Sequence, residues 1–126
     1  MKSLKLILPV EEYKGLKSLV SQHFGRAPFF ALVDLGDNWE IKDIRAVENK
    51  GKHMGGHASV EELVEDLKPD ALIVKGMGPR ALYAFQSQGI AVFTGEFETV
   101  EEAVKAYIAG RLTGLTEACK EARHPF

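Results

Sequence analysis

The chain has 126 residues, of which 45% are hydrophobic and 27% are charged, and its formal net charge is −2 at pH 7. This length and composition are typical of one globular domain that buries a single core. The slight acidic excess argues against a nucleic-acid binder, because proteins that follow phosphates usually carry a basic excess. The single cysteine, Cys119, excludes a disulfide within the chain, so we expect a protein of the reducing cytoplasm.

The start of the chain shows no targeting segment. Its first apolar run, residues 4–10, is interrupted by Lys5 and Pro9. A membrane-spanning helix needs about 20 mostly apolar residues, and a secretory leader needs an uninterrupted apolar stretch. We therefore expect neither a leader nor a contact with a membrane.

The first part of the chain predicts strands rather than helices. Three strands are expected, at residues 4–8, 29–34 and 39–47, with the first ending at Pro9 and the last two joined by a turn at residues 36–38. The apolar alternation of the third strand slips between Ile41 and Ile44, which predicts a bulge near Lys42 and Asp43. Residues 10–27 combine helically spaced apolar residues with glycine, so we favour an extended loop over a short helical turn.

After a polar, glycine-rich loop at residues 48–58, helices and strands alternate. Each predicted helix has start and stop signals: Ser59 with Glu62 and then Pro69, Pro79 and then Gly89, and Thr99 with Glu102 and then Gly110. The first helix also shows apolar residues at helical spacing, namely Val60, Leu63, Val64 and Leu67. Apolar runs at residues 71–74 and 90–93 predict two strands that are buried on both faces.

The resulting order of elements is β-β-β-α-β-α-β-α. Helices between the later strands imply right-handed crossovers and parallel pairing, whereas the early hairpin adds an antiparallel strand. We therefore predict a single α/β domain over residues 1–126, with a mixed five-stranded sheet and helices on its faces. Its core spans about residues 4–112 and its C-terminal tail residues 113–126. In such sheets, ligands bind at the loops beyond the carboxyl ends of the parallel strands.

The first candidate binding motif is SQHFGRAP, at residues 21–28. It places His23 beside Gly25 and Arg26 in a loop that precedes a buried strand. An imidazole in such a loop can bind iron or zinc, and Arg26 can offset negative charge on a ligand. The alternative is an ordinary hydrogen-bonded loop histidine, with Phe24 as a core residue.

The second motif is HMGGH, at residues 53–57. His53 and His57 have the spacing that suits a metal on a helix, but Gly55 and Gly56 argue against a helix here. The glycines instead allow the backbone to approach a ligand closely, with His57 just before a helix. The alternative is a loop in which His57 only helps to order the start of that helix.

The third motif is KGMGPR, at residues 75–80, where a strand leads through Gly76 and Gly78 into a helix that begins at Pro79. Unpaired N–H groups and the helix dipole make such a turn suitable for an anion. The turn lacks the lysine placement of a P-loop and the full GxGxxG spacing, so nucleotide binding is not predicted. The alternative is a tight strand-to-helix turn that binds nothing.

The sequence gives little support for a catalytic site. No Ser-His-Asp arrangement is visible, and clustered glutamates fall on predicted solvated helix faces, at Glu61, Glu62, Glu65, Glu101 and Glu102. Cys119 alone cannot hold an iron–sulfur cluster, which usually needs several thiolates, although a homodimer would bring two together. The favoured alternative is that Cys119 is a structural or tail residue. His124 falls in the predicted tail, where disorder is the default. We therefore predict a protein that is not an enzyme.

Taken together, the motifs resemble those of a known family. SQHFGRAPFFALVD, GGH before a capped helix, KGMGPRAL…GIAVFTG and TVEEAVKAYIAGRL occur in this order over about residues 4–112. In this combination the sequence is similar to the dinitrogenase iron-molybdenum cofactor biosynthesis family. That family includes NifX-like and NafY-like domains and the C-terminal domain of NifB proteins, and this chain resembles a stand-alone, minimal member.

The resemblance implies a fold and a set of binding residues. The fold is a three-layer α/β/α, RNase H-like arrangement with sheet order 3-2-1-4-5 and an antiparallel second strand. His23 matches the histidine of the family's HFG motif, which is a candidate cluster ligand. The GGH motif falls on Gly55, Gly56 and His57, followed by Ala58 where the family often has glycine. The GxGPRA turn falls on Gly76, Gly78, Pro79, Arg80 and Ala81.

The leading hypothesis is a carrier that binds an iron–sulfur or iron-molybdenum-type cluster transiently and exchanges it with donor and acceptor proteins. His23 and His57 would be the metal ligands, and Arg26, Arg80 and backbone N–H groups would surround the anionic cluster. One alternative is an anion or small-metabolite module that uses the Gly76–Arg80 turn, and another is a metal-independent docking module. Nuclease chemistry is not expected, because the first strand lacks carboxylates for two metal ions.

Overall fold

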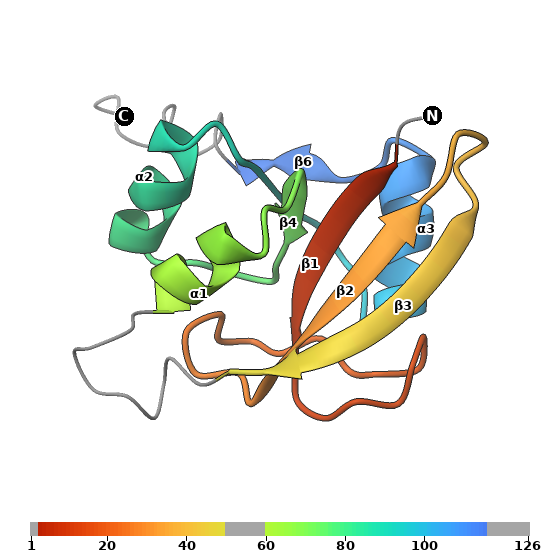
Figure 1. Cartoon of the computed structure of the whole chain (residues 1–126), viewed down its shortest axis with the longest axis horizontal. Coiled ribbons are helices and arrows are strands. Elements are labelled where there is room, and N and C mark those ends of the chain that lie inside the picture. The colour runs from red at the N-terminus through yellow and green to blue at the C-terminus, as the bar shows by residue number, and fades with distance from the viewer. Residues whose placement is uncertain (1–2, 50–59, 116–126) are drawn as a thin grey trace.

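The computed structural model describes residues 3–49 and 60–115. In chain order its elements are β1 (Leu4–Val10), β2 (Phe29–Leu35), β3 (Ile41–Glu48), α1 (Val60–Asp66), β4 (Ala71–Ile73), α2 (Pro79–Ser87), β5 (Ala91–Thr94), α3 (Val100–Ile108) and β6 (Thr113–Gly114). The strands form one sheet in the order β3-β2-β1-β4-β5-β6 (Figure 1). The β1–β4 and β4–β5 pairs are parallel, whereas the β1–β2, β2–β3 and β5–β6 pairs are antiparallel.

This topology confirms the predicted order of the first five strands and the antiparallel second strand. The predicted number of strands was wrong, because the sheet of the described residues has a sixth strand, β6. It lies at the start of the segment expected to be a tail, and its two residues pair with Phe93 and Thr94 of β5. Two residues are too few to show an alternation of apolar and polar side chains, so no sequence pattern predicted this strand.

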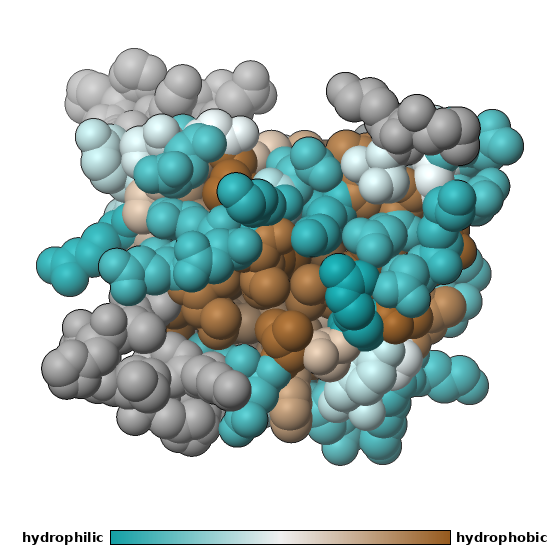
Figure 2. Space-filling view, in the orientation of Figure 1, coloured by the Kyte–Doolittle hydropathy of each residue, from teal (hydrophilic) through white to brown (hydrophobic). Residues whose placement is uncertain are grey.

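Helices cover both faces of the sheet, which confirms the three-layer arrangement (Figure 1). On one face, α3 packs through its buried residues Val100, Ala103 and Val104. On the other face, α1 and α2 pack against the sheet through Val64, Leu82 and Phe85. Figure 2 shows hydrophobic residues gathered at the centre of one side of the molecule, with hydrophilic residues around them. Successive residues of β1 alternate between the two layers, as expected for a strand covered on both faces.

Each of the five predicted strands differs from its predicted bounds by one or two residues, and the differences of two residues are at β1 and β3. β1 continues through Pro9 to Val10 rather than ending at Pro9. The carbonyl of Pro9 accepts a hydrogen bond from the amide of Ser21 at 2.7 Å. This side of Pro9 therefore faces away from β2, and its missing N–H removes no hydrogen bond between the two strands. β3 begins at Ile41 rather than Trp39, because Trp39 lies in the turn with a φ of 62°.

Other local predictions are confirmed. Asp34 pairs with Asp43 and Leu35 with Ile41, so Lys42 is the extra residue of a bulge. Residues 11–28 connect β1 to β2 as an extended loop without a helix. Backbone carbonyls of this loop accept hydrogen bonds from the first amides of α3, which fixes the loop against that helix.

The predicted signals at both ends of α2 and α3 are confirmed, whereas α1 ends at Asp66, before the predicted stop at Pro69, and Lys68 has a φ of 56°. Thr99 Oγ1 accepts a hydrogen bond from the amide of Glu102 at 3.2 Å, as in a capped N-terminus. Pro79 is the first residue of α2. Gly89 and Gly110 follow α2 and α3 with φ values of 80° and 74°. Ser59, the predicted start signal of α1, lies outside the described residues. Within residues 3–49 and 60–115, no helix has the length and apolar character required to cross a membrane.

Candidate functional site

Two of the three predicted binding loops, at residues 21–28 and 75–80, meet at one end of the sheet. The parallel strands β1 and β4 have their carboxyl ends there, and the antiparallel β2 begins there. A groove of about 550 Å³ opens between the loop before β2 and the turn after β4. We call it the histidine groove, and its lining residues are Gln22, His23, Phe24, Gly25, Arg26, Glu61, Gly76, Met77, Gly78, Arg80 and Ala81.

The loop around His23 is held by a buried serine. Ser21 is 2% exposed, and its amide donates to the carbonyl of Pro9 at the end of β1. Its hydroxyl accepts a hydrogen bond from the amide of His23 at 3.2 Å and donates one to the carbonyl of His23 at 3.1 Å. The backbone of His23 is therefore fixed, while its imidazole is exposed and accessible to a ligand.

Phe24 anchors the same loop in the core. Its ring lies 5.3 Å from the ring of Phe30 on β2 and 5.5 Å from the ring of Phe85 on α2. Because Phe24 is 5% exposed, the residue that follows His23 is buried between the sheet and α2. The prediction of Phe24 as a core residue is thus confirmed, and it does not compete with an exposed, ligand-accessible His23.

Asn49, which sequence reasoning did not single out, supports the other side of the loop. It is fully buried, and its side-chain Nδ2 donates to the carbonyls of Gly25 at 3.2 Å and Ala27 at 2.8 Å. The backbone N–H of Asn49 also donates to the carbonyl of Pro28. Its Oδ1 has no hydrogen-bond partner in the described part of the chain. Asn49 follows β3 directly, so it ties the third strand to the loop that carries His23 and Arg26.

The opposite wall of the groove is the start of α2. Gly78 is the N-cap residue, with φ −67° and ψ 158°, and no side chain caps the helix there. Pro79 has no amide hydrogen, so the N–H groups of Arg80 and Ala81 are the first that the helix presents. The positive end of the α2 dipole therefore faces a groove that Arg80 also lines.

Five of the eight predicted binding residues line this one groove, namely His23, Arg26, Gly76, Gly78 and Arg80. The other three, Gly55, Gly56 and His57, lie outside the described residues, as do His53, Cys119 and His124. Within the described ranges, no three His, Cys, Asp or Glu side chains come together as a metal site would require. His23 is the one histidine that those ranges contain.

Sequence reasoning assigned no binding role to Glu61 or Met77, although both line the groove. Glu61 was assigned to a solvated helix face, but it is half-buried and lines the groove from the first turn of α1. Met77, which lies between the two glycines of the motif in sequence, lines the groove and also packs, half-buried, against the core on this face of the sheet. A thioether is a soft donor that suits soft metal ions. The one sequence signal for the role of Met77 was its position between two glycines directly after a strand.

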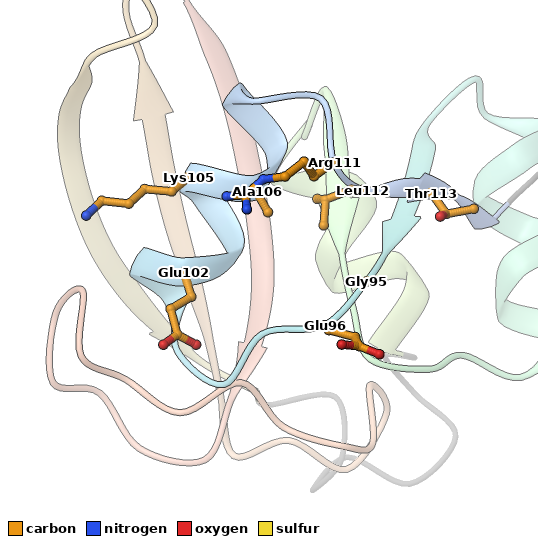
Figure 3. Close-up of a pocket in the computed structure, with 8 residues that line it drawn as sticks. All are labelled: Gly95, Glu96, Glu102, Lys105, Ala106, Arg111, Leu112 and Thr113. Carbon is orange, nitrogen blue, oxygen red and sulfur yellow. The ribbon is translucent and has the colours of Figure 1, made fainter.

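A second recess, of about 620 Å³, lies beside α3 and the β5–α3 connection (Figure 3). Its charged side chains are directed apart: Lys105 extends away from the side on which Glu96 lies. Lys105 forms an ion pair with Glu101 at 3.3 Å, and Glu102 accepts a hydrogen bond from the amide of Glu98 at 2.7 Å. Lys105 and Glu102 thus make local contacts within α3 and at its start. The histidine groove is therefore the better candidate site.

A family model described as dinitrogenase iron-molybdenum cofactor matches residues 5–110. The chain belongs to this family. The match covers the whole of the sheet except β6 and part of β1, together with all three helices. The resemblance inferred from the three motifs is thereby confirmed, and it places this domain among those involved in the biosynthesis or binding of the iron-molybdenum cofactor.

Similar proteins match nearly the whole chain, and those with solved structures share its fold. An uncharacterized protein of Methanocaldococcus jannaschii is 31% identical over 115 residues, which cover 89% of this chain and 92% of that protein. The NMR structure of a NifB-like protein from Thermotoga has a TM-score of 0.70 at 28% identity, covering 90% of this chain and 94% of the other. The apo form of the orange protein from Desulfovibrio gigas has a TM-score of 0.73 at 26% identity, covering 87% and 91%.

Proposed function

We propose that this protein binds an iron–sulfur-type metallocluster in the histidine groove and passes it between donor and acceptor proteins without catalysing a reaction. The observation that carries the proposal is the convergence of an exposed imidazole, two arginines and an uncapped helix start on one groove. Membership of a cofactor family supports the same class of ligand.

The chemistry of the groove suits an anionic cluster that must be released again. His23 supplies one nitrogen ligand, and Met77, which carries a soft thioether, lines the same groove. Arg26, Arg80 and the first N–H groups of α2 offset negative charge on sulfides. Glu61 opposes this effect and limits the affinity. Few protein ligands and an open groove favour exchange, whereas four thiolates would hold a cluster as a permanent structural part.

The remaining ligand predictions extend the proposal. We propose His57 as a second imidazole ligand, with Gly55 and Gly56 allowing close approach of the backbone. A homodimer that shares a cluster through Cys119 is the alternative source of further ligands. The cytoplasm, expected from the single cysteine, remains a prediction that fits a cluster sensitive to oxygen.

Anaerobic reconstitution tests the proposal. Wild-type protein, His23→Ala and His57→Ala are loaded with an iron–sulfur cluster, desalted, and compared by visible absorption and by metal content per chain. We expect stoichiometric retention by the wild type and a loss of at least about tenfold in affinity for His23→Ala, as for the removal of a metal ligand or its support. Gln88→Ala, an exposed change at the far end of α2, is the matched control. Equal retention by wild type and His23→Ala would remove His23 from the site.

A second candidate function uses the same turn without a metal. The uncapped start of α2 and Arg80 favour an anion such as phosphate or an anionic metabolite. This alternative predicts that phosphate raises the melting temperature in air, that Arg80→Ala abolishes the effect, and that His23→Ala leaves it intact. The cluster proposal predicts the reverse: His23→Ala should reduce metal retention more than Arg80→Ala does.

A further inference from the structure

A recess lies at the end of the sheet opposite the histidine groove. It has a volume of about 310 Å³ and is lined by Ser3, Leu4, Gly36, Asp37, Trp39 and Asp70. These residues come from the start of β1, the β2–β3 turn and the segment before β4. In Figure 1 the β2–β3 turn lies at the upper right, away from the loop between β1 and β2. We call this recess the tryptophan recess.

Trp39 is exposed at the wall of this recess. Its relative exposure is 51%, which is unusual for the largest apolar side chain. The amide of Trp39 donates to the carbonyl of Gly36, and the amide of Gly36 donates to the carbonyl of Glu40, so Trp39 occupies the left-handed position of a tight hairpin turn. Glycine fits that position without strain, yet the chain has a tryptophan there.

One side of the Trp39 ring is supported by α3. The rings of Trp39 and Tyr107 lie 6.4 Å apart, and the ring of Tyr107 packs edge-on against Phe93 at 5.4 Å. The indole is therefore held in place by an aromatic row that reaches from the turn to the sheet. The indole thus adds an exposed aromatic surface beside the recess.

Two carboxylates line the recess. Asp37 and Asp70 are both exposed, and none of the other lining residues in the described part of the chain is basic. The stem of the Lys42 side chain lies over Gly36 at the rim, so the carboxylates outnumber the one cation beside them. Asp70 Oδ2 accepts a hydrogen bond from the amide of Lys5 at 2.8 Å, which fixes the position of its carboxylate. The ammonium group of Lys5 donates to the carbonyl of Leu67 at 2.8 Å, so its charge is directed to the end of α1.

We propose that the tryptophan recess binds an organic cation, an alkylammonium or guanidinium group, against the face of Trp39 and the carboxylates of Asp37 and Asp70. Tryptophan is the best aromatic partner for such cations, and nearby carboxylates add attraction without requiring full dehydration. Two exposed carboxylates with an indole are a poor set for a transition metal, which prefers several nitrogen or sulfur ligands. The source of the cation is either a free amine or a lysine or arginine side chain of a partner protein.

Trp39 is the only tryptophan of the chain, so its fluorescence reports on this recess alone. The protein is titrated with choline, N-acetyl-arginine amide and a hexa-arginine peptide, at constant ionic strength. The neutral analogues 3,3-dimethylbutanol and N-acetyl-citrulline amide are the matched ligands. We expect the cations to change the emission in a saturable manner and the neutral analogues to leave it unchanged. Equal responses to a cation and its neutral analogue would overturn the proposal.

Two variants test the assigned residues. Asp37→Asn should weaken binding about fivefold, because it removes one exposed charge beside the cation. Glu48→Gln, at the other end of β3, is the charge-matched control and should leave binding unchanged. Trp39→Gly, followed by calorimetry instead of fluorescence, should abolish binding while relieving the left-handed strain. Unaltered affinity in Asp37→Asn or Trp39→Gly would contradict the assignment.

The same titrations distinguish the two sources of the cation. Affinity of the peptide more than about tenfold above that of the single arginine would point to a basic segment of a partner protein, since linked contacts reinforce one another. Equal affinities per cation would point to a free amine. Binding of any of the three probes that depends on Trp39 and Asp37 supports the recess, independently of cluster binding in the histidine groove.

Discussion

The ring of Phe24 meets the ring of Phe85 edge-on, with centroids 5.5 Å apart and planes at 82°. Phe24 directly follows His23, and Phe85 lies on α2, whose first turn carries Arg80. This single contact therefore links the two walls of the histidine groove. It positions the loop that carries the exposed His23 beside the start of α2, although the two segments are far apart in sequence.

Replacing Phe24 by leucine should lower both stability and cluster retention. The substitution removes the aromatic contacts with Phe30 and Phe85 and should cost about 1–2 kcal/mol in the free energy of unfolding. Urea denaturation followed by circular dichroism measures this loss. Phe93→Leu, on the opposite face of the sheet, should cost a similar amount without affecting cluster retention. If both variants retain the cluster equally, the contact does not position the groove.

Replacing Asn49 by alanine should destabilise the fold through the loop. The carbonyls of Gly25 and Ala27 would lose their donor, and an unpaired buried acceptor costs about 1–3 kcal/mol. Asn38→Ala, in the exposed β2–β3 turn, should change stability by less than about 0.5 kcal/mol. Chemical denaturation of both variants tests the difference, and equal losses would show that Asn49 has no special role.

Two glycine-to-alanine substitutions should have different effects on stability. Gly89 follows α2 with a φ of 80°, so Gly89→Ala should cost about 1–2 kcal/mol. Gly25 has no positive φ, and an added Cβ would have no neighbouring atom within 4 Å, so Gly25→Ala should leave stability unchanged or raise it by about 0.5 kcal/mol. Thermal unfolding separates the two. A loss for Gly25→Ala as large as that for Gly89→Ala would contradict the described loop backbone.

The phenol of Tyr107 should make the protein sensitive to alkali. Burial raises the pKa of Tyr107 above its usual value of 10.0, and the negative charge of Asp70 raises this pKa further. The folded state therefore favours the neutral phenol, and this contribution to stability is complete below the unfolded pKa and is lost as the pH rises through the folded pKa.

The free energy of unfolding should accordingly fall above about pH 10, and it should fall less in Tyr107→Phe. Tyr83→Phe is the matched control, because Tyr83 is 67% exposed. Denaturant titrations between neutral and strongly alkaline pH measure the slopes. If the wild type, Tyr107→Phe and Tyr83→Phe lose stability in parallel, the environment of Tyr107 does not differ between the folded and unfolded chain.

Local sequence patterns predicted most of the elements, because their signals lie within a few residues of one another. Thr99 caps the helix that its spacing to Glu102 predicts, and Pro79 begins α2 as its fixed φ requires. The bulge at Lys42 followed from a slip in apolar alternation within one strand. The order of elements then implied the parallel crossovers, and hence which loops share an end of the sheet.

Features that depend on distant residues were decided only by the tertiary structure. Pro9 stays within β1 because the amide of Ser21 reaches its carbonyl, and Glu61 enters the histidine groove because α1 packs beside α2. Trp39 was expected in a strand, but the turn places it against Tyr107, which is far along the chain. By itself the sequence determined every element except β6, the order of these elements, and the candidate binding residues His23, Arg26 and Arg80. Packing decided which side chains meet, because contacts between distant residues depend on sheet order and register, which no local pattern specifies.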